Sequence, residues 1–204
     1  MDIKSFKEFN TVTAKEWGKQ HYSDWLVAMQ NQTIKPETPT EQFFRYYTQG
    51  IHYVYNRVLK AGCDIDEYCK DSFLTPEMFY GAIEEMNNNS IKDEVVVYRY
   101  LDKDLLKQML KWSGNRRLQV GTIIFDRGFL STTLTPEAVS IGSASSNIFN
   151  RVFMKIYVPK NSPCVYLDLI SDMHENEILF PPSTKLKVLS RFLFGNYIEA
   201  TIII

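Results

Sequence analysis

The sequence is short of the features that mark several large classes of protein. It contains only three cysteines, Cys63, Cys69 and Cys164, an odd number without the spacing of a metal site. We therefore do not expect a disulfide framework. Lys and Arg together number 23 against 24 Asp and Glu, which gives a formal net charge of -1. Because nucleic-acid binders usually carry a basic surplus, no nucleic-acid partner is expected.

Long apolar runs are also missing. The first residues, MDIKSFKEFNTVTAKEW, contain no apolar segment of the kind that directs secretion. No run approaches the roughly 20 apolar residues that cross a bilayer as a helix, so no membrane span is expected. The chain is then a cytosolic protein, a mature form whose signal has been removed, or a protein exported by another route.

The 204 residues carry enough apolar side chains for one well-filled core. Hydrophobic residues make up 45% of the chain and aromatic residues 14%, with 13 Phe and 12 Tyr. This length and composition are ordinary for one globular domain. Since no repeat, low-complexity tract or linker divides the chain, residues 1–204 are predicted to form a single domain.

The first part of the chain, about residues 1–90, has the apolar periodicity of helices. Residues typical of helix caps and stops mark three of them. Thr13 to Glu16 has the pattern of a capping box. The three predicted helices run from about Thr13 to Met29, from Thr40 to Gly62, and from Thr75 to Asn89.

In the second part, about residues 91–204, the period of the apolar residues changes from 3.6 to 2. A short helix is expected only around Leu105 to Trp112. Helices first and many short strands later, without β–α–β alternation, favour an α+β fold with a mostly antiparallel sheet. The predicted strands are Glu94–Tyr100, Thr122–Phe125, Gly128–Thr133, Val152–Val158, Val165–Leu169, Glu177–Phe180, Leu186–Leu189 and Tyr197–Ile204.

Two glutamates, Glu175 and Glu177, stand one residue apart where the stretch HENEILFPP enters an apolar strand. In an extended chain, residues two apart point to the same side, so both carboxylates would face one direction. Two such groups repel each other unless cations or hydroxyls hold them, or one takes up a proton. A solvated pair at the end of a strand is the ordinary alternative.

Two other stretches contain suitable partners for these acids. The strand EVVVYRY ends near Arg99, whose guanidinium suits an anion such as phosphate. The stretch GFLSTTL places the hydroxyls of Ser131, Thr132 and Thr133 among apolar residues, where they need acceptors. Taken singly, Arg99 is an ordinary strand-end cation and the hydroxyls are satisfied by the backbone. The order Arg, Ser-Thr-Thr, Glu-x-Glu is more specific than any one part.

In this order the chain resembles the Arg–Ser–Glu class of mono-ADP-ribosyltransferases, especially the catalytic domains of clostridial actin-modifying binary toxins and related exoenzyme toxins. The likeness covers most of the chain. It implies a helical N-terminal part packed on a mostly antiparallel two-sheet β core. It also implies an enzyme that transfers ADP-ribose from NAD to an arginine of a target protein and releases nicotinamide. The stretches that carry the likeness are AKEWGKQHYSDWL, YYTQGIHYVYNRVL, GFLSTT, IYVPKNSPCVYLDL and ENEILFPPSTKLKV.

The resemblance implies a role for each motif residue. Arg99 would hold the phosphate and the nicotinamide ribose of NAD. Ser131 would orient Glu177, which would bind the ribose 2′-hydroxyl and stabilise the oxocarbenium-like centre left by nicotinamide. Glu175 would orient the incoming nucleophile, and in this family a glutamate there goes with arginine as the acceptor. The implied catalytic residues are therefore Arg99, Ser131, Glu175 and Glu177.

The family also lines its cofactor site with residues outside these motifs. Tyr47 and Asn56 match positions on the second helix. In the loop Thr135–Asn150, Phe149 is available for stacking, although a core position is the alternative, and Arg151 follows for phosphate. The predicted cofactor-binding residues are Arg99, Ser131, Thr132, Glu177, Tyr47, Asn56, Phe149 and Arg151.

Several positions depart from the family pattern. Tyr100 stands where the family commonly has glycine or a second arginine. Gly128 replaces an asparagine of the actin-modifying toxins, and His52 falls near a family tyrosine. In the loop Asp168–His174, which is expected to contact the protein substrate, Asp172 replaces an aromatic residue. Actin is therefore one candidate target among others.

Three functions stay open at this point. The first is an arginine-specific transferase that acts as a toxin or effector in the host cytosol after secretion or injection, with a delivery or translocation partner. Phage-encoded transferases that modify the host transcription machinery form a variant of it. The second is an NAD glycohydrolase, and the third is a non-catalytic docking module, against which the intact motif residues argue. His174 beside Glu175 has no second histidine close by, so no metal is expected.

Overall fold

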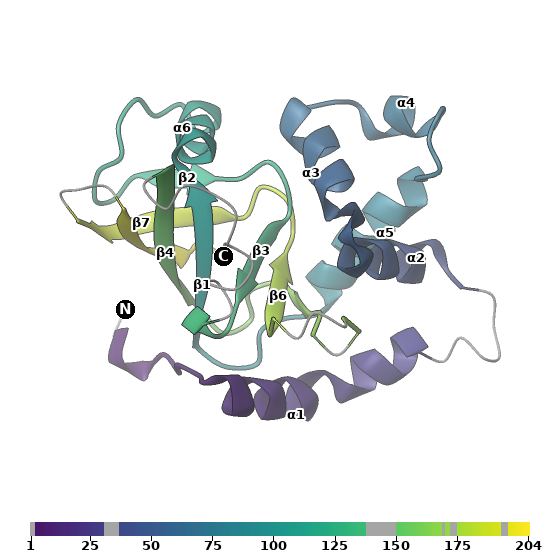
Figure 1. Cartoon of the computed structure of the whole chain (residues 1–204), viewed down its shortest axis with the longest axis horizontal. Coiled ribbons are helices and arrows are strands. Elements are labelled where there is room, and N and C mark those ends of the chain that lie inside the picture. The colour runs from purple at the N-terminus through teal and green to yellow at the C-terminus, as the bar shows by residue number, and fades with distance from the viewer. Residues whose placement is uncertain (1–2, 31–36, 138–149, 169, 172–174, 193–195) are drawn as a thin grey trace.

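The computed structural model describes residues 3–30, 37–137, 150–168, 170–171, 175–192 and 196–204. Within them, helices form the first part of the chain and strands the second, as predicted (Figure 1). The helical elements are η1 (Ile3–Ser5), α1 (Thr11–Gln30), α2 (Pro39–Tyr46), η2 (Tyr47–Ile51), α3 (His52–Ala61), α4 (Ile65–Cys69), α5 (Pro76–Asn88) and α6 (Lys103–Trp112). The strands are β1 (Val95–Asp102), β2 (Ile123–Phe125), β3 (Leu130–Thr133), β4 (Arg151–Val158), β5 (Val165–Tyr166), β6 (Glu177–Phe180), β7 (Lys185–Arg191) and β8 (Tyr197–Ile202).

Helix α1 is capped by Asn10. Its side-chain oxygen accepts hydrogen bonds from the backbone N–H groups of Val12 and Thr13, at 3.1 and 3.0 Å. The Thr13 hydroxyl in turn accepts the N–H of Asn10. The capping box predicted for Thr13 to Glu16 is therefore wrong by one turn, because Thr13 closes the box from inside the helix instead of opening it.

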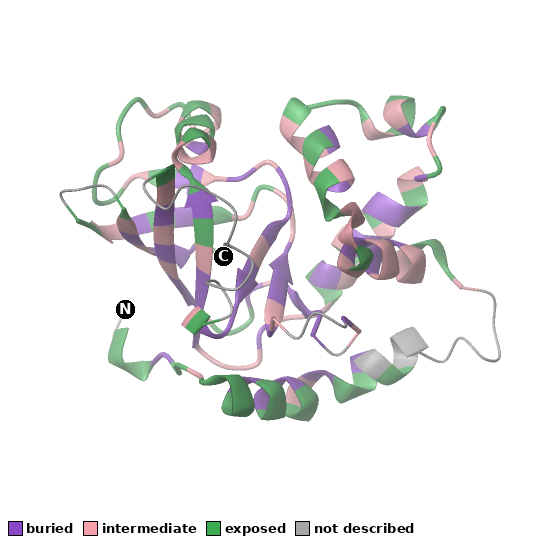
Figure 2. Ribbon diagram, in the orientation of Figure 1, coloured by how far each residue is buried: buried purple, intermediate pink, exposed green. Residues whose placement is uncertain are grey.

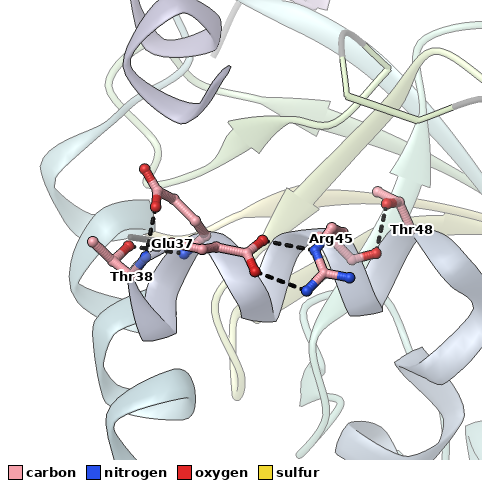
Figure 3. Close-up of polar contacts among 5 residues, drawn as sticks. Glu37, Thr38, Arg45 and Thr48 are labelled. Atoms are coloured by element: carbon pink, nitrogen blue, oxygen red, sulfur yellow. Dashed lines mark hydrogen bonds and ion pairs between the residues drawn. The ribbon is translucent and has the colours of Figure 1, made fainter. Parts of the chain in front are cut away.

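Helix α2 is capped by Thr38, two residues before the predicted cap Thr40. The hydroxyl of Thr38 accepts the N–H of Glu41, and the Glu41 carboxylate accepts the N–H of Thr38 at 2.6 Å (Figure 3). Glu37 then binds Arg45 through two parallel hydrogen bonds of 2.7 and 2.8 Å. These contacts fix the start of the helix and tie its first turn to its last.

The single helix predicted up to Gly62 is broken in the middle. Gly50 has φ 94°, a left-handed conformation that no regular helix contains, and it lies in the π-helical turn η2. Beyond the break, α3 starts at His52 and ends at Gly62, which has φ 69° and confirms the predicted stop. The break leaves the rings of Tyr47 and His52 with centroids 5.7 Å apart.

The strands that the structure describes form one sheet in the order β2-β7-β8-β4-β1-β3-β6-β5. The pair β4–β8 is parallel and the other pairs are antiparallel, so the mostly antiparallel character is confirmed. The two-sheet core is wrong. β1 pairs with β4 along its whole length but with β3 only at Tyr98 opposite Thr133. This short bridge joins two groups of strands that would otherwise be separate sheets.

Among the described residues, apolar side chains form three clusters, and alternate residues of β3 and β6 face one or the other of the two larger ones. Leu130 and Ile178 belong to the cluster that includes Trp17 of α1. Leu179 belongs to the second cluster, with Phe43 and many other residues of α2, α3 and α5. In Figure 2 the strands are largely buried and the exposed residues gather on the outer faces of the helices. Because side chains alternate along a strand, Ser131 and Thr133 of β3 lie on the same face as Leu179 and Glu177 of β6. This face points to the helices α2, α3 and α5.

Membrane insertion of a helix was not expected, and no helix within the described ranges combines the length and the apolar character that a membrane crossing requires.

The contact between α1 and β5 generates a test of the packing. A Cβ atom on Gly18 would lie 2.1 Å from the buried ring of Tyr166. We expect Gly18→Ala to lower the free energy of unfolding by about 1–3 kcal/mol, because the ring must shift in a filled core. Urea unfolding followed by circular dichroism measures the change. Lys19→Ala, at the exposed neighbouring position, is the control, and a Gly18→Ala protein as stable as wild type would contradict the contact.

Candidate active site

The motif residues Ser131 and Glu177 meet on neighbouring strands. Glu177 is the first residue of β6 and lies opposite Thr133 of β3. Ser131, two residues earlier on the same face, donates a hydrogen bond from its hydroxyl to Oε1 of Glu177 at 2.5 Å. Thr133 donates its hydroxyl to the backbone oxygen of Glu175 at 2.5 Å. Two hydroxyls of β3 thus hold the side chain of one glutamate and the backbone of the other.

Thr132 lies between these two residues and faces the other way. Its side chain is buried, and its hydroxyl donates to the backbone oxygen of Ile178 at 3.0 Å. The structure does not bring the Thr132 hydroxyl to the glutamates, and its role as a cofactor-binding residue stays a prediction.

The chain between the two glutamates is not extended, which changes the expected geometry. Asn176 has φ 51°, and β6 begins only at Glu177. The two carboxylates still influence each other, since the charge of Glu175 raises the pKa of Glu177. The pair is therefore set by a left-handed turn and not by strand alternation alone.

Partial burial has the largest effect on the pKa of Glu177. Removal from water raises the pKa of Glu177 to about 7, since an isolated buried carboxylate favours its neutral form. The hydrogen bond from Ser131 lowers this pKa, whereas the charges of Glu175 and Asp168 raise it further. For Glu175, burial likewise raises the pKa, His52 lowers it and Asp168 raises it. Both acids thus have a pKa above that of an exposed glutamate.

Arg99 is held from one side only. Its Nη2 atom donates to Oδ2 of Asp126 at 3.1 Å, and the Asp126 side chain is fully buried. The same Asp126 oxygen lies 3.3 Å from Nζ of Lys60, and its other oxygen accepts the N–H of Gly128 at 3.0 Å. The Nη1 atom of Arg99 is buried, and no group of the described residues accepts a hydrogen bond from it. A buried donor of this kind is costly to leave unpaired, so the geometry suits an anionic ligand at Nη1.

The sequence prediction missed Asp126 and Lys60. Burial lowers the pKa of Lys60, Asp126 raises it and Arg99 lowers it, so the three groups form one electrostatic unit. A signal was available, because Asp126 stands at the end of the apolar strand IIFD and a buried acid needs cations. The partner from α3 could not be identified without the fold.

Tyr47 connects the acidic and the basic groups. Its side chain is buried, which raises the pKa of its hydroxyl, and the charge of Glu177 raises that pKa further. The hydrogen bond with Asn56 and the charge of Arg99 lower it. Because one hydroxyl is affected by both Glu177 and Arg99, these residues lie around the same point of the molecule. The structure thus brings Tyr47 and Asn56 together with the motif residues, and their role as cofactor-binding residues stays a prediction.

Gly128 allows α3 to approach the loop before β3. The side-chain oxygen of Asn56 accepts the N–H of Phe129 at 2.8 Å. A Cβ atom on Gly128 would lie only 2.4 Å from that oxygen and 3.0 Å from Cε of Lys60. The departure from the family pattern at Gly128 therefore has a steric consequence, since no side chain fits at this position while Asn56 stays in place.

Arg151 is not brought into this cluster. It is the first residue of β4 and lies opposite Asp102, on the face of the sheet that carries Phe153. Arg99 lies opposite Met154, on the other face. The cofactor role of Arg151 stays a prediction. Phe149, Asp172 and His174 lie outside the described residues.

The described arrangement combines three capabilities. A buried carboxylate oriented by a hydroxyl can stabilise positive charge that develops in a transition state. A guanidinium with one free arm can bind phosphate, and a half-buried second carboxylate can hold a cationic nucleophile. Among the residues that the structure describes, no group of three or more His, Cys, Asp or Glu side chains is placed to hold a metal ion.

Comparison with known proteins gives a family match along almost the whole chain. The model of the ADP-ribosyltransferase exoenzyme family matches residues 14–201. A mono(ADP-ribosyl)transferase of Salmonella typhimurium, SpvB, is 28% identical over 189 residues, which covers 82% of this chain and 28% of SpvB. The chain thus spans less than a third of the length of the curated relatives that it matches.

Solved structures share the fold at lower identity. The C3stau2 protein of S. aureus, solved with NAD, is 20% identical with a TM-score of 0.69 and covers 98% of this chain and 99% of its own. The ADP-ribosyltransferase Vis, solved with agmatine, is 17% identical with a TM-score of 0.63 and covers 99% of this chain and 89% of its own. The predicted ADP-ribosyltransferase fold is confirmed, with one sheet instead of two.

The raised pKa of Glu177 predicts how stability depends on pH. The folded protein holds the Glu177 proton more tightly than the unfolded chain, whose glutamate has a pKa of 4.5. This contribution to stability is complete below pH 4.5 and is lost as the pH rises through about 7. Glutamine carries no charge, so Glu177→Gln avoids the cost of ionising this side chain in the folded protein. Its free energy of unfolding should exceed that of wild type by about 3 kcal/mol at pH 8 and by little near pH 4.5.

Urea unfolding at several pH values between 4.5 and 8 measures this difference. Glu84→Gln, at an exposed position of α5, is the control and should give the same small difference at each pH. A Glu177→Gln protein whose advantage does not grow with pH would show that Glu177 is not buried in its charged form.

Proposed function

We propose, from the premise that this chain belongs to the ADP-ribosyltransferase exoenzyme family, that it is an NAD-dependent mono-ADP-ribosyltransferase whose acceptor is an arginine of a target protein. Its catalytic domain would span residues 1–204. The observation that carries the proposal is the partly buried Glu177, whose pKa is raised and whose Oε1 atom accepts the Ser131 hydroxyl. An acid kept at such a cost in stability is typical of a functional site.

Arg99 would receive the anionic part of NAD. Its Nη2 atom is bound to Asp126, so the guanidinium has a fixed orientation and presents the unpartnered Nη1 atom to a phosphate oxygen. Lys60 lies against the same Asp126 and adds positive charge on that side. The fit to a phosphate is good because none of the described residues supplies an acceptor for this buried donor.

Glu177 would act on the bond that is broken. When the bond between the ribose and the nicotinamide nitrogen breaks, its electron pair leaves with nicotinamide and positive charge develops on the ribose. An ionised Glu177 stabilises that charge and can accept the ribose 2′-hydroxyl, while Ser131 keeps the carboxylate from rotating. A cationic nicotinamide close to Glu177 would also lower its pKa and favour the ionised form.

Glu175 would hold the acceptor. Its carboxyl group is only partly buried, and a carboxylate binds a guanidinium in a two-pronged geometry. The relative Vis has been solved with agmatine, a guanidinium compound, which agrees with an arginine acceptor. Because arginine keeps its proton up to a pKa of about 12 or more, Glu175 would orient the nucleophile and not fully deprotonate it.

The biological setting follows from family membership. We propose that the protein is secreted or injected and acts on a host protein in the host cytosol, with a separate component for delivery. The target, whether actin or part of a transcription machinery, is left to experiment. The intact Arg99, Ser131, Glu175 and Glu177 argue against a docking module without catalysis. An NAD glycohydrolase would use the same site with water as the acceptor.

Substitution of each glutamate separates the two steps. Glu177→Gln should abolish both transfer and NAD hydrolysis, because both need stabilisation of the ribose cation. Glu175→Gln should abolish transfer to agmatine or arginine and spare most of the hydrolysis. Nicotinamide release is measured with and without agmatine, together with mass spectrometry of the acceptor. Transfer that persists in Glu175→Gln would disprove the division of roles, and hydrolysis unaffected by any acceptor in wild type would indicate a glycohydrolase.

Arg99→Lys tests the proposed phosphate contact. A lysine keeps the charge but cannot bind Asp126 and a phosphate oxygen with separate nitrogens, so NAD affinity should fall at least about tenfold. Isothermal titration with NAD measures the dissociation constant directly. Arg116→Lys, at an exposed position, is the matched control and should bind like wild type. Equal NAD affinity in Arg99→Lys would remove Arg99 from the cofactor site.

A further inference from the structure

Asp168 is a third carboxylate beside the two glutamates. It opens the loop expected to contact the protein substrate, yet its side chain is buried. Its Oδ1 atom accepts the backbone N–H of Asn176 at 2.7 Å. A buried carboxylate is retained only where donors compensate its lost hydration, and one donor here is the backbone N–H of Asn176, between Glu175 and Glu177.

Asn176 is held in a left-handed conformation that residues other than glycine and asparagine rarely adopt. Its φ of 51° lies in the left-handed region, and its side chain is buried. Besides the bond to Asp168, its backbone oxygen accepts the N–H of Leu134 at 3.1 Å. Its side-chain oxygen accepts the hydroxyl of Tyr166 at 3.0 Å. Three hydrogen bonds therefore determine this turn, two with the segment Tyr166–Asp168 and one with Leu134, as expected where a left-handed backbone persists.

Tyr166 connects the turn to the core. Its ring is buried against Gly18 of α1, where no side chain would fit, and lies near Trp17, with ring centroids 6.3 Å apart. One residue later, the N–H of Leu167 donates to the backbone oxygen of Glu177 at 2.8 Å. The segment from Tyr166 to Asp168 thus contacts Asn176 and Glu177 directly and is itself fixed by the N-terminal helix.

We propose that Asp168 is a positioning residue of the proposed transferase site, because its hydrogen bond to Asn176 fixes the turn that sets Glu175 beside Glu177. The inference rests on the proposed function and deepens it. Without this bond, Asn176 can leave the left-handed region, and Glu175 then moves relative to Glu177. Transfer to the acceptor depends on that separation more than hydrolysis does, since only transfer uses both acids.

The charge of Asp168 adds a second effect. It raises the pKa of both glutamates. The other groups that act on them are Ser131 and Tyr47 at Glu177 and His52 at Glu175. These groups remain in a variant at position 168. A change in the pKa of either glutamate in that variant therefore reports the contribution of Asp168 alone.

Two substitutions separate the hydrogen bond from the charge. Asp168→Asn keeps an oxygen that can accept the Asn176 N–H and removes the charge. It should retain transfer within about threefold of wild type, and the acid limb of its pH profile should move to lower pH by about half a unit. Asp168→Ala removes both the acceptor oxygen and the charge. Its rate of transfer to agmatine should fall at least about tenfold more than its rate of NAD hydrolysis. Asp104→Asn, an exposed acid of α6, is the control and should match wild type in all three measurements.

A measurement without turnover distinguishes this inference from the proposed function. Carbon NMR of glutamate labelled at the side-chain carboxyl gives the pKa of Glu177, assigned by the signal missing in Glu177→Gln. A lower pKa in Asp168→Asn, unchanged in Asp104→Asn, supports the inference even if the wild-type protein never releases nicotinamide, an outcome that would refute only the proposed function. An unshifted Glu177 signal in Asp168→Asn, or equal losses of transfer and hydrolysis in a folded Asp168→Ala, overturns it. If Asp168→Ala does not fold, Asp168→Glu decides, because its carboxylate keeps the charge but is displaced by one methylene from the Asn176 N–H. A folded Asp168→Glu that loses no more transfer than hydrolysis overturns the inference.

Discussion

The hydrogen bond between Ser131 and Glu177 is the interaction around which the rest of the structure is arranged. A carboxylate removed from water needs donors, and this one receives its donor from the neighbouring strand β3. The register of β3 and β6 places Thr133 opposite Glu177, so that the second hydroxyl reaches the backbone of Glu175. A slip of one residue between these strands would turn the serine to the opposite face and leave the acid without its partner.

The basic side of the site holds two positive charges close together, those of Arg99 and Lys60. Arg99 and Lys60 would repel each other if they were brought together alone, and the buried Asp126 between them compensates both charges. Asp126 comes from the segment between β2 and β3, whereas Arg99 comes from β1. These segments meet because β1 bridges both groups of strands, at Tyr98 to β3 and along its full length to β4. The one-sheet topology is therefore a requirement of the site.

The chemistry of the site was easier to predict from the sequence than its geometry. Arg99, Ser131 and the glutamates were identified because polar residues in apolar strands need partners, and their order matches a known class of enzymes. The left-handed turn at Asn176 was not predicted, because it depends on a hydrogen bond that Asn176 donates to Asp168 and on a tyrosine fixed by α1. The break at Gly50 was missed for a related reason, since the periodicity of apolar residues continues through the π-helical turn. The local sequence pattern predicts which helices and strands form. It does not predict departures such as the turn at Asn176 and the break at Gly50.

Gly128 shows how such contacts constrain the divergence of related sequences. Its hydrogen atom in place of a side chain leaves room for the Asn56 amide, and the two positions occupy one shared volume. A related protein with a larger residue at the first position must have a smaller or displaced one at the second, or a helix shifted outward. Positions 128 and 56 should therefore covary. Transfer of the loop before β3 from a related protein would fail unless the residue at position 56 of α3 were exchanged with it.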